Sequence, residues 1–67
     1  MIGSYKQLLK YRGENVELYL SGNDSVMIEK GMVTNIVVGL GENGVFLELN
    51  NEILINVRYI IKMRIIF

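Results

Sequence analysis

The stretch that most constrains the fold is ILINVRYIIKMRIIF, residues 53–67. Every second residue of this stretch is hydrophobic: Ile53, Ile55, Val57, Tyr59, Ile61, Met63, Ile65 and Phe67. Such alternation is typical of a β-strand, in which successive side chains point to opposite faces. The run is much longer than a usual strand of about five or six residues. We therefore expect a break near Tyr59 or Ile60 that divides it into two strands belonging to different sheets of a barrel.

The second of these strands, from Ile61 to Phe67, carries Lys62 and Arg64 on the face opposite its hydrophobic row. It lies at the end of the sequence, so it would form an edge whose backbone groups lack a partner unless another chain pairs with it. We predict that this segment is an oligomer interface. The predicted interface residues are Ile60, Ile61, Met63, Ile65, Ile66 and Phe67.

Two turns upstream set the expected strand register. Asn43-Gly44 is typical of a two-residue type I′ hairpin, because both positions tolerate positive φ. This turn would place hydrophobic residues opposite one another on a single face. The expected pairs are Val38 with Leu49 and Leu40 with Leu47.

The second turn, Asn50-Asn51-Glu52, is expected to be a three-residue loop. A two-residue loop is rejected because it would place Leu49 opposite Glu52. The three-residue loop gives the pairs Leu49 with Ile53, Leu47 with Ile55 and Val45 with Val57.

Further towards the N-terminus, a strand is expected from about Val26 to Leu40, and its Gly31 predicts a bend. A half-buried strand precedes it from Asn15, followed by a polar turn over residues 21–25. Before these strands, Tyr5, Leu8 and Leu9 follow helical spacing and predict a helix over about residues 5–11. The pair Ser4 and Gln7 is typical of a capping box, and Gly13 of a left-handed helix end.

Composition favours one small domain, residues 1–67, with the barrel over about residues 15–67. Of the 67 residues, 51% are hydrophobic, and none is Cys or His. A chain of this size buries only about 60% of the surface that it exposes when unfolded. Neither a disulfide nor an ordinary zinc site can add stability here. We therefore expect a homo-oligomer with no cofactor and no metal.

Several functions are disfavoured by charge and residue type. The formal net charge is 0, so composition supplies no general attraction to nucleic acid, and no DNA partner is expected. Without His or Cys, and with Asp24 as its one Asp, the chain is not expected to be an enzyme. No apolar run reaches the roughly 20 residues that span a bilayer, and the first residues lack a signal-peptide core. We expect a cytoplasmic protein without a membrane partner.

The layout as a whole resembles the Sm-like family and is most similar to its bacterial Hfq-type members. Three stretches carry the resemblance: Val16–Gly22, Gly31–Val33 and Ile55–Ile60. It covers nearly the whole chain. The fold that it implies is all-β, a small, strongly bent, five-stranded SH3-like or Sm-like barrel with a short N-terminal helix.

The resemblance also implies a ring, in which the last strand of one subunit pairs with the fourth strand of the next, and single-stranded RNA as a partner. Hfq-type proteins carry a Lys-His pair at the junction of the last two strands, where this chain has Val57-Arg58-Tyr59. Arg58 matches the Arg of an Arg-Gly step in archaeal and eukaryotic Sm proteins, but Tyr59 replaces the Gly. A barrel that binds a protein or another non-RNA partner is the alternative, which the neutral charge and absent His favour.

The predicted RNA-binding residues are Arg58, Tyr59, Asn56, Asn43, Lys6 and Lys10. The guanidinium of Arg58 suits both phosphate contact and base stacking, although an ordinary ion pair is an equal alternative. The ring of Tyr59 suits base stacking. However, Tyr59 alternates in step with Val57 and Ile61, which favours a position in the core or in an interface. Asn43 is expected mainly to adopt the positive φ that the hairpin turn requires, and only secondarily to contact a base. Lys6 and Lys10 share a helix face that is also consistent with simple solvent exposure.

Overall fold

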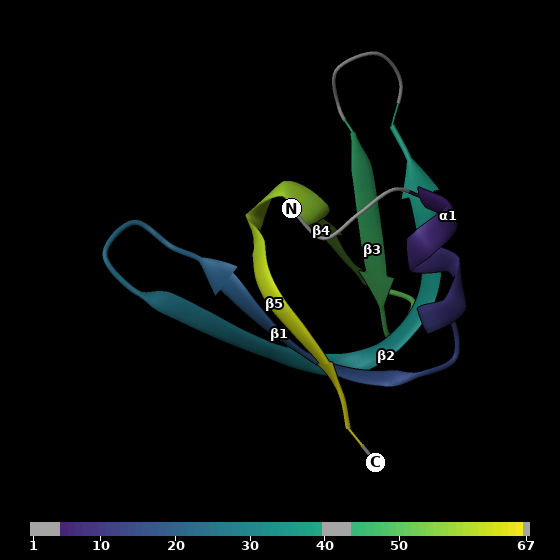
Figure 1. Cartoon of the computed structure of the whole chain (residues 1–67), viewed down its shortest axis with the longest axis horizontal. Coiled ribbons are helices and arrows are strands. Elements are labelled where there is room, and N and C mark those ends of the chain that lie inside the picture. Colours follow the sequence, from purple (N-terminus) through teal and green to yellow (C-terminus); the bar gives the residue numbers. More distant parts are fainter. Residues whose placement is uncertain (1–4, 40–43, 67) are drawn as a thin grey trace.

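The computed structural model of the chain describes residues 5–39 and 44–66. These residues form a short helix, two 3-10 turns and five antiparallel strands (Figure 1). The sequence predicts the helix and the five strands but not the 3-10 turns. The elements are α1 (Tyr5–Leu8), η1 (Leu9–Tyr11), β1 (Asn15–Ser21), β2 (Val26–Val38), β3 (Val45–Leu49), β4 (Ile53–Asn56), η3 (Val57–Tyr59) and β5 (Ile60–Ile65).

The strands form one sheet in the order β4-β3-β2-β1-β5. The long strand β2 joins its two halves, because residues 26–32 pair with β1 and residues 33–38 with β3. The expected closed barrel is not found. Within the described residues, β4 and β5 are the two edges of an open, bent sheet (Figure 1).

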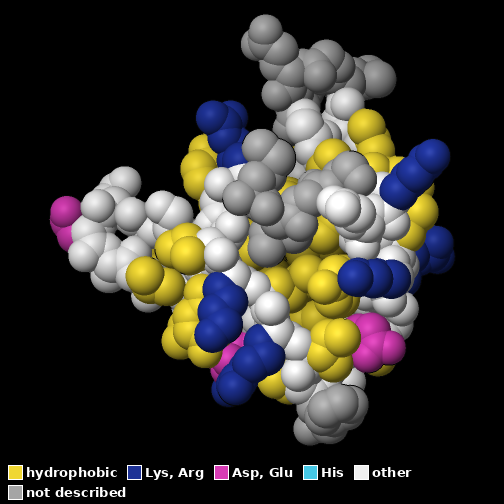
Figure 2. Space-filling view, in the orientation of Figure 1, with side chains coloured by type: hydrophobic (Ala, Val, Ile, Leu, Met, Phe, Trp, Pro, Cys, Tyr) yellow, Lys and Arg dark blue, Asp and Glu magenta, His cyan; other side chains and the backbone are white. Residues whose placement is uncertain are grey.

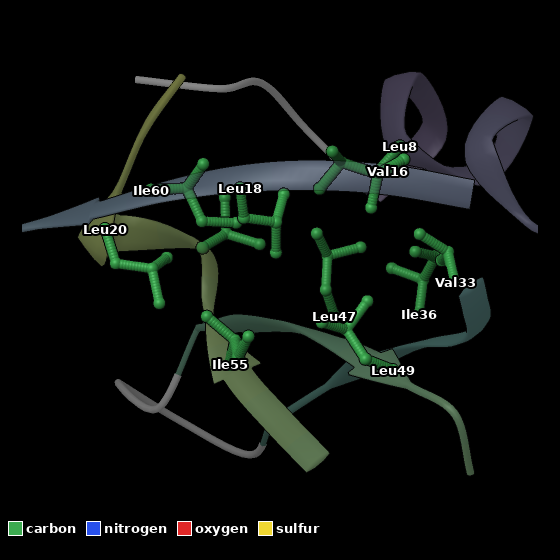
Figure 3. Packing of buried hydrophobic residues seen from close by; sticks show 11 residues of the cluster. Leu8, Val16, Leu18, Leu20, Val33, Ile36, Leu47, Leu49, Ile55 and Ile60 are labelled. Carbon is green, nitrogen blue, oxygen red and sulfur yellow. The ribbon is translucent and has the colours of Figure 1, made fainter. Parts of the chain in front are cut away.

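The core lies inside the bend, between the two halves of the sheet and α1 (Figure 3). Leu8 of α1 is fully buried there against residues of the strands. Alternation along the strands supplies most of the other core side chains. The cluster consists of Leu8, Val16, Leu18, Leu20, Val33, Ile36, Leu47, Leu49, Ile55, Val57 and Ile60.

Strand β2 bends where its pairing passes from β1 to β3 (Figure 1), next to the Gly31 at which the sequence predicts a bend, and hydrogen bonds from the turn between β3 and β4 hold it there. Asn50 acts as a strand partner for Met32: its backbone N–H donates to the Met32 carbonyl (2.9 Å), and its side-chain Oδ1 accepts from the Met32 N–H (3.0 Å). A Cβ atom at Gly31 would lie 2.6 Å from Nδ2 of Asn50. The missing side chain at Gly31 therefore leaves the space that the Asn50 amide occupies.

The predicted register of β2 and β3 is wrong. Val38 pairs with Val45 and not with Leu49, and Leu47 pairs with Ile36 in place of Leu40. The register shifts between Val33 and Asn35, and as a result Val33 pairs with Leu49. The shift buries Ile36 and leaves Val38 exposed beyond the core. The loop is consequently wider than a two-residue turn and is closed by a bond from the Gly39 N–H to the Gly44 carbonyl. Asn43 and Leu40 lie outside the described residues.

The predicted register of β3 and β4 is confirmed at two pairs, Leu49 with Ile53 and Leu47 with Ile55. Asn50 and Asn51 both adopt positive φ in the connecting turn, as Asn tolerates better than most residues. The third predicted pair, Val45 with Val57, is wrong because Val57 belongs to η3.

The predicted break near Tyr59 is confirmed, because η3 separates β4 from β5. The single alternating phase expected through this region is wrong. Ile60 is buried in the core and Ile61 is 59% exposed. Leu20 of β1 pairs with Ile60 while Tyr19 pairs with Lys62, so Ile61 is the extra residue of a bulge.

The predicted helix at residues 5–11 is found as α1 continued by η1. Gly13 has a φ of 84°, the left-handed conformation expected after the helix end. Ser4 of the predicted capping box lies outside the described residues.

Candidate nucleic-acid interface

The 3-10 turn η3 joins the two edges of the sheet, and Asn56 fixes its start. The Asn56 side chain accepts a hydrogen bond from the backbone N–H of Arg58 at 3.0 Å. This is the capping geometry by which Asn satisfies a backbone donor at a helix start. Asn56 thereby determines how the next two side chains project.

Arg58 and Tyr59 project together from η3 into solvent. Tyr59 is 52% exposed, so it is not the core aromatic that its phase favoured. The guanidinium carbon of Arg58 lies 5.6 Å from the centroid of the Tyr59 ring, within cation–π range. Among the residues that the structure describes, Arg58 has no salt bridge. A cation next to an accessible aromatic ring is the combination that holds single-stranded nucleic acid.

An open pocket of about 470 Å³ lies beside this pair. Hydrophobic side chains dominate its walls, and Ser21 and Asn56 add polar groups. Ligand pockets in proteins are typically lined mostly by hydrophobic side chains, with a few polar groups that orient the ligand. The lining residues are Leu20, Ser21, Met27, Phe46, Leu54, Ile55, Asn56 and Tyr59.

The structure brings together three of the six predicted RNA-binding residues. Asn56 and Tyr59 line the pocket, and Arg58 adjoins it. Lys6 and Lys10 are exposed on α1 and η1, and neither lines the pocket.

Sequence reasoning missed the pocket wall. Met27, Phe46 and Leu54 come from three different strands, and only the folded sheet places them around Tyr59. One signal was present in the sequence: Met27 and Leu54 are hydrophobic residues that alternation does not assign to the core. Both are more than half exposed.

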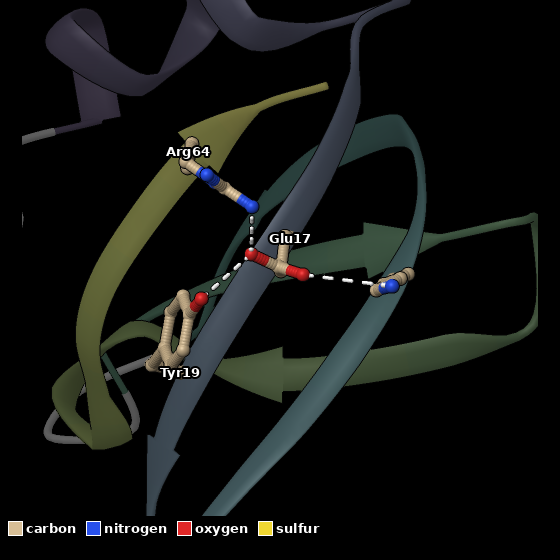
Figure 4. Close-up of polar contacts among 4 residues, drawn as sticks. Glu17, Tyr19 and Arg64 are labelled. Atoms are coloured by element: carbon tan, nitrogen blue, oxygen red, sulfur yellow. Dashed lines mark hydrogen bonds and ion pairs between the residues drawn. The ribbon is translucent and has the colours of Figure 1, made fainter. Parts of the chain in front are cut away.

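On the face of the sheet opposite the core, Glu17 of β1 forms a polar cluster (Figure 4). Its Oε1 accepts hydrogen bonds from the Tyr19 hydroxyl and from Nη2 of Arg64, both at 2.7 Å. Nζ of Lys30 lies 3.6 Å from Oε2. The Glu17 side chain is covered by these neighbours, whereas Lys30 and Arg64 are more than half exposed.

This cluster predicts that stability falls in acid. The hydrogen bond from Tyr19 lowers the pKa of Glu17 below its ordinary 4.5, burial opposes this, and Arg64 lowers the pKa further. The carboxylate therefore stabilises the fold at pH above its ordinary pKa, and this contribution disappears as the pH falls through the lower pKa of the folded state. We expect the urea midpoint of the wild type to fall from pH 7 to pH 3 more steeply than that of Glu17→Gln. An equal slope for both proteins would contradict this role of Glu17.

The predicted interface residues take different positions. Ile60 is 5% exposed and belongs to the core of its own chain, so it has little surface to offer a neighbour. Ile61 and Ile65 are exposed, and Met63 packs partly against the core. Ile66 is half-buried, and Phe67 lies outside the described residues.

Charged and hydrophobic side chains share the visible surface (Figure 2). Hydrophobic side chains are exposed around the middle of this face, and Lys and Arg side chains lie around them. The β1–β2 hairpin projects from the body of the molecule (Figure 1) and carries the exposed residues Val26, Met27 and Ile28.

Comparison with protein-family models, with curated proteins and with solved structures finds no match to this chain. Within residues 5–39 and 44–66, no helix is long and apolar enough to cross a membrane. The function has to be inferred from the site itself.

Proposed function

We propose that this chain is an Sm-like protein that assembles into a ring and binds single-stranded RNA. The observation that carries the RNA part is the exposed Arg58–Tyr59 pair beside an open, mainly apolar pocket. A base would enter the pocket and stack on the Tyr59 ring, while the guanidinium of Arg58 meets a neighbouring phosphate. Stacking of this kind is worth about 1–3 kcal/mol per base.

The sheet's edges support the assembly part. Strands β4 and β5 each pair on one side only, within the part of the chain that the structure describes. Unpaired edges are sites where another strand can add, and proteins normally cover or blunt them. A head-to-tail contact between β5 of one copy and β4 of the next covers both edges at once and closes by rotation. In a ring, several copies of a weak RNA site can bind one RNA strand at the same time, which raises the overall affinity.

A protein-binding scaffold is the second candidate, and the projecting hairpin favours it. Val26 and Ile28 lie on one face of the hairpin and each is more than half exposed, whereas Met27 lies on the other face and lines the pocket. Exposed hydrophobic patches of this kind mark interaction surfaces in soluble proteins.

The RNA proposal is tested by fluorescence anisotropy with labelled oligo(A) and oligo(U) at low salt. We expect wild type to bind at least one of them. Tyr59→Ala and Arg58→Glu should each weaken that binding at least about fivefold, because each loses a contact worth about 1 kcal/mol or more. The measured affinity should also fall as salt is added, since phosphate contacts release counterions.

Arg12→Glu is the matched control for Arg58→Glu. It makes the same change of charge at an exposed position after η1, away from the pocket. Its binding should stay within about threefold of wild type, a change of less than about 0.7 kcal/mol. Absence of wild-type binding at low salt would exclude the RNA function, and wild-type affinity in the two pocket variants would exclude this site.

A further inference from the structure

The half of the sheet formed by β1, β5 and the first half of β2 has an outer face that points away from the core. Glu17 and Tyr19 alternate along β1 with residues of the core cluster, so their side chains point outward. Glu17 pairs with Lys30 of β2 and with Arg64 of β5, and Tyr19 pairs with Lys62 of β5. The outer face of this half therefore brings three cationic side chains together.

The carboxylate of Glu17 lies among these cations and is covered by its neighbours (Figure 4). The Glu17 side chain is 8% exposed, whereas those of Lys30 and Arg64 are 63% and 58% exposed. Glu29 of β2 lies opposite a buried residue of β1 and is therefore on the other face. Along the outward-facing positions of these strands, all of which the structure describes, the accessible charge is consequently positive only.

The cations of this face keep hydrogen-bond donors for an outside partner. Nη2 of Arg64 donates to Glu17 at 2.7 Å, but a guanidinium carries five N–H groups. Nζ of Lys62 lies 5.6 Å from the centroid of the Tyr19 ring, and Lys62 has no salt bridge among the residues that the structure describes. Three cations against one carboxylate leave a surplus of positive charge. This face can therefore bind further carboxylates.

A row of hydrophobic side chains runs along β2 on the same face. Val26 and Ile28 pair with Ser21 and Tyr19 of β1, so they share the outward side of the sheet, and each is more than half exposed. Aliphatic side chains offer no stacking surface to a base, but they bury well against hydrophobic side chains of a protein. The aliphatic row beside the cations therefore favours an acidic protein segment over nucleic acid.

We propose that this face binds an acidic amphipathic helix of another protein. The hydrophobic stripe of the helix packs on Val26 and Ile28, and its carboxylates meet Lys62 and Arg64. Charge complementarity selects this occupant, because the accessible charges of the face are positive. The inference rests on the protein-binding candidate described above and names the chemistry of its partner. It requires neither RNA binding nor assembly.

The dimensions of a helix suit the two rows. Strand β1 separates β2 from β5, so the hydrophobic row and the cations of β5 are two strand spacings apart, about 10 Å. A helix with its side chains is about 10–12 Å wide and can cover both rows. Lys62 and Arg64 are about 7 Å apart along their strand, and helix residues four apart are separated by about 6 Å along the axis. Carboxylates one helical turn apart can therefore meet both cations.

A designed peptide tests the proposal. The probe is a fluorescently labelled helical peptide with Glu along one stripe and Leu along the adjacent stripe, and its binding is followed by anisotropy at low salt. We expect wild type to bind it. Lys62→Glu and Ile28→Ser should each bind at least about fivefold more weakly, because the first loses a charge attraction and the second a hydrophobic contact. A peptide in which Lys replaces every Glu should bind Lys62→Glu more tightly than wild type, which separates a lost contact from a lost fold.

Two matched variants place the same kinds of change away from this face. Arg12→Glu reverses an exposed cation after η1. Val38→Ser truncates a residue of β2 that is 57% exposed, close to the 53% of Ile28, but lies in the part of β2 that pairs with β3. Both should bind the probe within about twofold of wild type. A peptide of the same composition in shuffled order, without stripes, should bind wild type at least about fivefold more weakly.

The outcomes show which proposal fails. Absence of wild-type binding to the probe at low salt, or unchanged binding by Lys62→Glu, would overturn the assignment of this face. Equal binding of the shuffled peptide would exclude the helix. Displacement of the bound probe by oligo(A) or oligo(U) would assign the face to nucleic acid and contradict the proposal. Tyr59→Ala, which alters the RNA site, should leave binding of the probe unchanged, so a failure of RNA binding is distinguished from a failure of peptide binding.

Discussion

Replacement of Leu47 by alanine is expected to unfold most of the protein near physiological temperature. Leu47 is fully buried at the centre of β3, where it pairs with Ile36 on one side and Ile55 on the other. Truncation of a buried leucine removes hydrophobic burial and leaves a cavity, at a cost of about 2–5 kcal/mol. A domain of this size has little stability in reserve. A loss of about 3 kcal/mol corresponds to a melting temperature lower by about 15 °C.

Leu54→Ala is the matched control for this prediction. Leu54 is the same residue type in the adjacent strand, but it is 56% exposed. Its truncation should change the free energy of unfolding by less than about 0.5 kcal/mol, as is usual for surface positions. Thermal and urea unfolding followed by circular dichroism measures both variants. Similar losses for Leu47→Ala and Leu54→Ala would show that the core is not centred on β3.

Gly31→Ala is expected to destabilise the bend of β2 by about 1–3 kcal/mol, because the new methyl group displaces the Asn50 amide and deprives the Met32 N–H of its acceptor. The methyl carbon would lie 2.6 Å from Nδ2 of Asn50, well inside normal contact distance. Asn50 is held by two hydrogen bonds to Met32, so its side chain cannot move aside without breaking one of them.

A double-mutant cycle isolates this contact. Asn50→Gly removes the amide, and glycine readily adopts the φ of 54° found at this position. In the Asn50→Gly background, Gly31→Ala should change the free energy of unfolding by less than about 0.5 kcal/mol. The measurement is the urea midpoint of the four proteins. Additive losses would mean that Gly31 is required for its backbone conformation and not for the space that it leaves to Asn50.

Strand positions were largely predictable from the sequence, because alternation depends on the chain alone. The strand beginning at Asn15, the bend at Gly31 and the break before Ile60 all follow from local pattern and residue type. The register of β2 and β3 was not predictable in this way. Asn43-Gly44 favours a tight turn locally, but burial of Ile36 opposite Leu47 favours a wider loop, and the core contacts prevail.

The candidate site was predictable only in part, for a similar reason. Arg58 stood out because its guanidinium suits phosphate contact and base stacking and because it matches the Arg of an Arg-Gly step, and Asn56 because its amide suits hydrogen bonding. Tyr59 was assigned to the hydrophobic phase, since nothing in the local sequence shows that η3 rotates the chain at this point. The 3-10 turn exposes the Tyr59 ring and turns Ile60 into the core. That rotation places Arg58 and Tyr59 next to one another at the pocket.

The sequence by itself determined the element types of this protein: a short helix, five strands, and a hydrophobic segment too long to be one strand. These depend on periodicity and on Gly and Asn at turns, which act over a few neighbouring residues. Only the tertiary structure decided which strands became edges, which residues line the pocket and where each charge lies on the sheet. These depend on contacts between residues far apart in the chain, whose register is set by burial of the shared core.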